Sequence, residues 1–175
     1  KKEIIERVKK LSDNYNNERI KKGKEKRNIS PEFILIHTFA NLVINQFSYE
    51  CGYGSSALRE RIYCNLEFPN DTMNGVLIYT ASGDSEGSLG GLVRQGKQGN
   101  LETIVYNSIE NARWCSSDPI CIDSHGQGPN SCNLAACHNC SLLPETCCEE
   151  SNMLLDRAML IGTLDNPNLG YFHSI

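Results

Sequence analysis

Thiol groups are concentrated near one end of this chain. Seven of the nine cysteines fall between Trp114 and Glu149, and two of them, Cys137 and Cys140, are separated by only two residues. A turn with this spacing lets two thiolates reach one ion, and two more ligands from nearby loops complete a tetrahedron with zinc–sulfur distances of about 2.3 Å. The cluster therefore predicts a structural zinc site within a long, irregular loop.

Disulfide bonds and redox catalysis are the two alternative interpretations of these cysteines. Nine is an odd number, which in a secreted protein would leave a thiol unpaired. The first residues, Lys1-Lys-Glu-Ile-Ile-Glu, resemble neither a signal peptide nor a natural start, so we expect a fragment of a longer, cytoplasmic protein. Thiols stay reduced in the cytosol, and the loop-like residues 126–131 ahead of Cys137 do not suit a thioredoxin-like motif. Zinc is therefore favoured.

Charge is distributed unevenly along the chain. Residues 1–27 hold eleven Lys/Arg and five Asp/Glu, a net charge of +6, whereas residues 28–175 hold six and sixteen, a net charge of −10. A nucleic-acid-binding domain usually has a basic face, so the acidic body argues against strong direct DNA binding. The basic segment is interpreted as a solvated helix face that could also contact phosphates. Because no apolar run reaches 18 residues, no transmembrane helix is expected.

The elements that would position the cysteines are mainly helical. Apolar residues at helical spacing predict helices over 2–22, 30–50 and 100–114, with a short helix near Leu92. The helix at 30–50 begins with Ser30 and Pro31 and carries apolar residues on most sides, so we expect it to be central. Residues 55–62 are interpreted as a short helix, 75–80 as a buried strand, 151–160 as a helix and 159–163 as a strand.

Three other features have competing interpretations. The small residues between Ser82 and Gly91 are interpreted as a tight turn, although Asp84 and Glu86 could hold a divalent cation for metal-dependent hydrolysis. His37 lies in the predicted central helix and is interpreted as a core histidine with its hydrogen bonds satisfied. The charges at 59–61 are interpreted as surface ion pairs, with an interface or phosphate contact as the alternative.

Several motifs occur together and in order. They are His37-Thr-Phe-Ala-Asn-Leu, Leu58-Arg-Glu-Arg-Ile-Tyr63, Tyr79-Thr-Ala-Ser-Gly-Asp-Ser-Glu-Gly-Ser-Leu-Gly-Gly-Leu92, Trp114-Cys-Ser-Ser-Asp-Pro-Ile-Cys121, Asn133-Leu-Ala-Ala-Cys-His-Asn-Cys140 and Leu143-Pro-Glu-Thr-Cys-Cys-Glu149. Over about residues 30–175 the chain resembles the C-terminal domain of the DrmB family of the DISARM antiphage system. That domain is similar to the zinc-binding C-terminal domain of MrfA-type helicases.

The resemblance implies a four-cysteine zinc site in a domain that is not itself the motor. Carried over, it gives five candidate ligands for four places: Cys115, Cys121, Cys137, Cys140 and Cys148. Cys137 and Cys140 match the turn of the family pattern, although the glycine and proline of the helicase form are missing. Cys148 is preferred to Cys147, and the choice between Cys115 and Cys121 stays open.

The sequence thus predicts an α/β fold, mainly helical, with a small central sheet and a zinc-stapled cysteine-rich loop module under the 100–114 helix. A basic helical extension at 1–29 precedes a DrmB/MrfA-like zinc-binding domain at 30–175. We expect a non-catalytic accessory domain that partners a DrmA-like helicase subunit and meets DNA through the complex. The alternatives are a stand-alone DNA-binding module, the hydrolase noted above, and a redox switch that uses Cys132 and Cys147.

Overall fold

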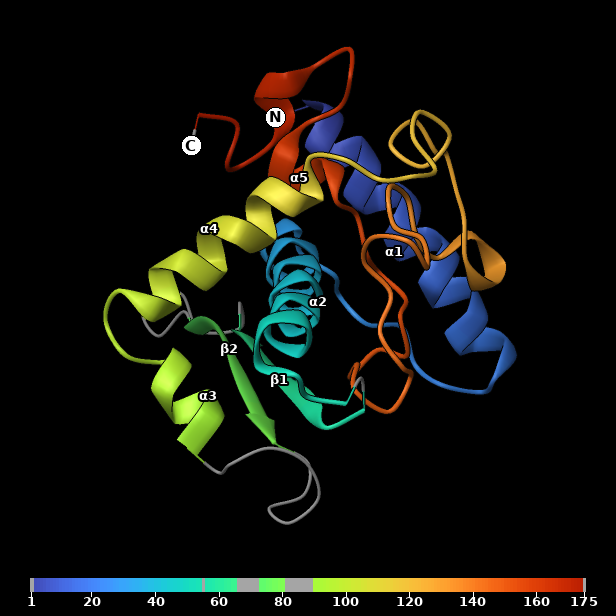
Figure 1. The fold of residues 1–175 in the computed structure, drawn as a ribbon. Helices are drawn as coiled ribbons and strands as arrows, with labels where there is room; N and C mark the ends of the chain where they lie inside the picture. Colours follow the sequence, from blue (N-terminus) through green and yellow to red (C-terminus); the bar gives the residue numbers. More distant parts are fainter. Residues whose placement is uncertain (1, 55, 66–72, 81–89, 175) are drawn as a thin grey trace.

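The computed structural model describes residues 2–54, 56–65, 73–80 and 90–174 (Figure 1). Its helices are α1 (Lys2–Lys21), α2 (Pro31–Cys51), α3 (Gly90–Gln95), α4 (Asn100–Ala112) and α5 (Ala158–Ile161), and its strands are β1 (Leu58–Asn65) and β2 (Met73–Thr80). Short 3-10 turns lie at Pro129–Ser131 and Pro167–Leu169. The predicted fold class is confirmed: helices dominate, the sheet is small, and the cysteine-rich segment is mostly loop.

Helix α2 runs through the middle of the molecule, with α4 and α1 on different sides of it (Figure 1). Its start is set by Ser30, whose hydroxyl accepts a hydrogen bond from the backbone N–H of Phe33, and by Pro31 in the first turn. It ends at Gly52, which has the left-handed φ of 67° that glycine adopts without strain. Eleven of its residues are buried, so α2 forms the central support of the fold.

Strands β1 and β2 form an antiparallel pair in which Leu58 lies opposite Thr80. The predicted short helix over 55–62 is wrong, because this segment alternates with the period of a strand. Leu58, Glu60 and Ile62 are buried, while Arg59 and Arg61 between them are exposed. The charged Glu60 at an inward position interrupts the apolar alternation by which a strand is predicted from sequence.

The predicted strand over 75–80 is confirmed within β2, but it is not fully buried. Leu77 and Tyr79 are 50% and 40% exposed, whereas Val76 and Ile78 are partly covered. Val76 and Ile78 line an apolar groove with Phe39 of α2. A two-stranded sheet packed on one helix leaves its other face open, which explains the alternation.

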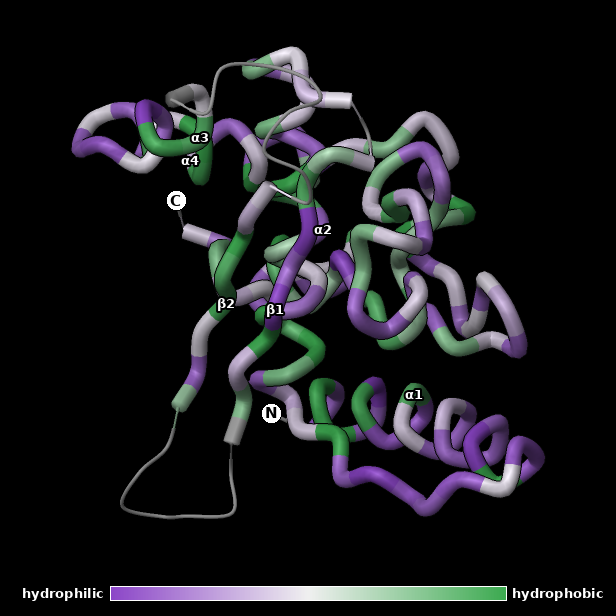
Figure 2. The backbone as a smooth tube through the Cα atoms, turned by 90° about the horizontal axis from the view of Figure 1, so that it is seen from below, coloured by the Kyte–Doolittle hydropathy of each residue, from purple (hydrophilic) through white to green (hydrophobic). Residues whose placement is uncertain are grey.

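Helix α1 packs against the rest of the chain along one side. Val8, Leu11 and Tyr15 are buried in a core cluster that also contains Phe33 of α2 and Leu154 from near the C-terminus. Figure 2 shows apolar positions recurring between hydrophilic ones along this helix. The spacing lets α1 bury an apolar stripe while most of its basic residues stay at the surface.

The segment after the cysteines is less regular than predicted. The helix predicted over 151–160 is reduced to α5, and the strand predicted over 159–163 is wrong. Residues 154–157 instead exchange backbone hydrogen bonds with residues 132–135, as from Leu134 N to Leu155 O and from Arg157 N to Ala135 O. Asn152 and Leu154 adopt positive φ angles of 58° and 65°, which a helix does not allow. Among the described helices, none has both the length and the apolar character needed to cross a membrane.

Candidate metal centre

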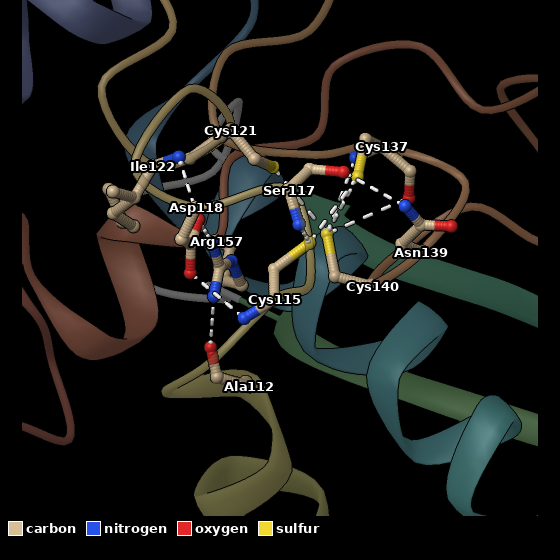
Figure 3. Close-up of polar contacts among 12 residues, drawn as sticks. Ala112, Cys115, Ser117, Asp118, Cys121, Ile122, Cys137, Asn139, Cys140 and Arg157 are labelled. Carbon is tan, nitrogen blue, oxygen red and sulfur yellow. Dashed lines mark hydrogen bonds and ion pairs between the residues drawn. The ribbon is translucent and has the colours of Figure 1, made fainter.

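Four thiol groups meet at one point in the cysteine-rich loop. The sulfur atoms of the four-thiol cluster all lie within 4.8 Å of one another; its members are Cys115, Cys121, Cys137 and Cys140. The Cys115–Cys137, Cys121–Cys140 and Cys137–Cys140 sulfur distances are 3.5, 3.8 and 3.7 Å. Figure 3 shows the four side chains pointing toward one another. A tetrahedral zinc with sulfur ligands at about 2.3 Å would separate them by roughly 3.8 Å, so the cluster fits this ion.

Two short turns present these sulfurs. The first begins just after α4 and is organised by Asp118, whose carboxylate accepts hydrogen bonds from the backbone N–H groups of Cys115 and Ile122 at 2.8 and 3.0 Å. The second is the turn from Cys137 to Cys140, in which the carbonyl of Cys137 accepts from the N–H of Cys140 at 3.2 Å. Each turn therefore brings two sulfurs to the same side of its backbone.

Arg157 links the first turn to the end of α4. Its side chain is fully buried, and it donates hydrogen bonds to the carbonyl oxygen of Ala112 at 2.7 Å and to Asp118 Oδ1 at 2.6 Å. Burial alone would lower the pKa of Arg157, but the contacts with Asp118 and the nearby Cys140 raise it overall. The guanidinium thus stays charged and places a fixed positive charge beside the cluster (Figure 3).

The cluster cannot hold four negative charges without a cation. Hydrogen bonding from the Cys121 thiol, followed by the Ser141 hydroxyl and the Cys137 N–H, lowers the pKa of Cys140 to about 5 against the cost of burial. The same hydrogen bond, together with burial, raises the pKa of Cys121, and burial raises that of Cys115. A divalent ion would let the thiols ionise together.

The structure gathers four of the five predicted ligand candidates and places the fifth elsewhere. Cys148 lies beside α2 and β1, with its sulfur 2.9 Å from His37 Nε2. The chain after Cys140 turns back toward α2, where Asn41 donates a hydrogen bond to the carbonyl of Ser141 at 3.1 Å. Both Cys115 and Cys121 belong to the cluster, so geometry does not require a choice between them.

Other predicted functional residues do not join this centre. Cys132 and Cys147 are buried in two different core clusters, where each packs among apolar side chains. His138, inside the second turn, is exposed. Asp84 and Glu86, the basis of the hydrolase alternative, lie outside the described residues.

Asp118 and Arg157 organise the first turn, and neither role was predicted from the sequence. Asp118 lies three residues after Cys115 and directly before a proline. This is a common pattern for a turn in which the aspartate accepts hydrogen bonds from backbone N–H groups. Arg157 gave no comparable signal, because its role depends on chain segments 39 residues apart.

Comparison with known proteins identifies the kind of domain. The family model of the MrfA Zn-binding domain matches residues 39–141, which is more than half of the chain and includes the whole four-thiol cluster. The chain is also 43% identical over 143 residues to the DISARM protein DrmB of Bacillus paralicheniformis. That match covers 82% of this chain and 25% of the relative, so the chain spans about a quarter of the relative's length. The chain therefore belongs to the MrfA zinc-binding domain family.

Proposed function

We propose that this chain is a structural zinc-binding accessory domain of a DISARM-type antiphage defence protein, with Cys115, Cys121, Cys137 and Cys140 as the zinc ligands. The convergence of four thiols at tetrahedral spacing carries the proposal. Four thiolates would close the coordination sphere and leave no position for a water or a substrate, which argues for a non-catalytic role. The identity to the DISARM protein DrmB supports the assignment to defence.

Zinc would stabilise a segment that has little regular structure of its own. Between α4 and α5, the described chain contains only one 3-10 turn. Ordering such a long loop costs conformational entropy, which metal binding would help to offset. Metal binding supplies folding free energy directly, and it would fix the loop against the end of α4 and the 151–157 segment.

The domain would act through a partner, for which a DrmA-like helicase subunit is the proposed candidate. The groove between α2, β2, α3 and α4 is lined by apolar side chains, of which Leu101 is exposed. Further large apolar side chains are exposed on β2, α3 and α4: Leu77, Tyr79, Val93 and Tyr106. Scattered apolar residues are ordinary on a surface, but an apolar groove is typical of protein–protein contact.

The domain would contact DNA mainly as part of its complex with the helicase subunit. Five basic side chains of the N-terminal segment already have acidic partners within the chain: Lys2, Arg7, Lys9, Lys21 and Arg27. This leaves less of the segment's positive charge for phosphates. A direct DNA contact is the second candidate, because Lys22, Lys24 and Lys26 form an exposed basic run after α1.

Co-expression of the full-length protein with a DrmA-like helicase tests the proposal. We expect the helicase to co-purify with the wild type, and Leu101→Asp, at the wall of the groove, to weaken capture at least tenfold. Tyr171→Asp is the control, because Tyr171 is also an exposed apolar side chain but lies near the C-terminus. If the wild-type protein captures no helicase, the partner assignment fails.

A salt titration separates the two modes of DNA contact. Changing Lys22, Lys24 and Lys26 together to glutamate would reduce the salt dependence of single-stranded DNA binding if the domain binds DNA directly. If DNA is met through the helicase, the same change leaves binding by the complex within about twofold.

A further inference from the structure

A second group of metal-binding side chains lies in the interior, away from the four-thiol cluster. His37 of α2, Glu60 of β1 and Cys148 of the later loop are 0%, 3% and 6% exposed. The Nε2 atom of His37 lies 2.9 Å from the Cys148 sulfur and 3.2 Å from Glu60 Oε1. The three ligand atoms all lie within 4.8 Å of one another. Three elements far apart in the sequence thus converge on one buried point.

The arrangement differs from a Cys–His–carboxylate relay. In such a relay the thiol and the carboxylate bind opposite nitrogens of the imidazole. Here both contact the same nitrogen, and His37 Nδ1 is buried without a hydrogen-bond partner in the structure. One N–H group can donate well along only one direction, so it cannot serve both acceptors fully. Side-chain atoms that bind one metal ion converge on a common point in this way.

The charge of the group also requires a cation. A carboxylate and a thiol in the dry interior are costly when ionised, unless positive charge compensates them. One oxygen of Glu60, Oε2, is buried and has no hydrogen-bond partner in the structure.

We propose that His37, Glu60 and Cys148 form a second divalent-metal site, for which Zn²⁺ is the best-suited ion. Imidazole nitrogen, carboxylate oxygen and thiolate sulfur are all ligands that zinc accepts, and the charges of one carboxylate and one thiolate balance a divalent ion. The family match at residues 39–141 contains neither His37 nor Cys148, so it does not account for this site. The four-thiol cluster and this site share no residue.

The backbone around the ligands holds them in place. The N–H of Asn152 donates to the Cys148 sulfur at 3.1 Å, and the N–H of Glu149 donates to Glu60 Oε1 at 3.1 Å. Such outer hydrogen bonds orient metal ligands and tune their basicity. A metal here would join α2, β1 and the loop that leaves the four-thiol cluster.

Metal counting on the whole chain tests the proposal. The protein is saturated with zinc, desalted, and measured by native mass spectrometry and elemental analysis. We expect two zinc ions per wild-type chain, one for Cys148→Ser, one for His37→Gln, and two for Cys147→Ser as the matched control. One zinc in the saturated wild type overturns the second site. If Cys137→Ser then loses that ion while Cys148→Ser keeps it, the four-thiol proposal stands alone.

A measurement on the unmutated protein covers the case in which a variant does not fold. X-ray absorption at the zinc edge of the saturated wild type reports the average ligand set. We expect a clear nitrogen/oxygen contribution, with roughly five sulfurs shared between two ions. A purely sulfur shell, with about four sulfurs for each ion, contradicts the second site.

Discussion

Arg157 and Asp118 form an ion pair in which the guanidinium is completely enclosed, with Nη2 2.6 Å from Oδ1. The same carboxylate caps the turn that carries Cys115 and Cys121, and the same guanidinium caps the end of α4 at Ala112. The pair therefore holds two of the proposed zinc ligands, Cys115 and Cys121, in a fixed position relative to the end of α4.

Replacing Asp118 with alanine should destabilise the protein strongly. The substitution leaves Arg157 as a buried, unpaired charge and leaves the N–H groups of Cys115 and Ile122 without their acceptor. A loss of about 3–5 kcal/mol is expected, and chemical denaturation measures it. Asp123→Ala is the control: Asp123 is exposed in the same loop, so its change should cost under about 0.5 kcal/mol. Equal stabilities of the two variants would contradict this role of Asp118.

Removal of zinc should unfold the loop before the helices. Cys137→Ser, which removes a ligand of the four-thiol cluster alone, is expected to increase amide hydrogen exchange over 115–148 by at least tenfold, because the metal supplies the folding energy of that segment. Exchange within α2 should change far less, since its buried residues pack mostly on other helices and the sheet. Cys51→Ser, which changes a half-buried thiol outside both proposed metal sites, should leave the exchange pattern unaltered. A uniform increase along the chain would argue against a local role for zinc.

The ion pair between Arg7 and Asp156 should matter for attachment of α1. Arg7 contacts both carboxylate oxygens of the buried Asp156, at 2.7 and 2.8 Å. Arg7→Met should cost about 3 kcal/mol, near the lower end for a broken buried pair because the Arg7 side chain is partly exposed. Lys10→Met, on an exposed position of the same helix, should cost under about 0.5 kcal/mol. Thermal unfolding of the two variants makes the comparison.

Alkaline conditions should weaken the packing of α1. Burial and, after it, the hydrogen bond to Glu150 raise the pKa of Tyr15 above its ordinary value of 10.0. The unfolded chain then loses its phenolic proton first, so this contribution to stability is complete below about pH 10 and is lost as the pH rises through the raised pKa. Tyr15→Phe should flatten the alkaline fall in stability, whereas Tyr106→Phe, at an exposed site, should keep it. Identical alkaline profiles for both variants would disprove the assignment.

Elements with regular spacing and end signals were predictable from sequence, and those set by distant contacts were not. Helix α2 follows from Ser30, Pro31 and its apolar residues, each of which acts locally. Strand β1 was missed because Glu60 occupies an inward position, where its partner His37 comes from another element. The expected helix at 151–160 failed because residues 154–157 pair with 132–135, a choice that depends on the fold of the loop.

Among the proposed metal ligands, too, those defined by local spacing were predictable and those defined by distant contacts were not. The two-residue spacing of Cys137 and Cys140 identified the second turn, since both thiols lie on one short stretch of chain. The family resemblance grouped Cys148 with the same site, and distance along the chain does not report the return of the backbone to α2. The prediction of surface ion pairs for the charges at 59–61 is confirmed only for Arg61, which pairs with Glu149. Glu60 lies buried beside His37 instead.

The attachment of α1 has a consequence for synthesis on the ribosome. The apolar stripe of this helix packs against Leu154 and Met159. The ion-pair partner of Arg7, Asp156, lies 149 residues later in the chain. Helix α1 can pack early on Phe33 of α2, but it lacks these later contacts until residues 154–159 have left the exit tunnel. A nascent chain stalled just before residue 150 should therefore leave part of the stripe exposed to chaperones, and translation through residue 160 should cover it. The packing of α1 is thus completed late in the synthesis of this domain.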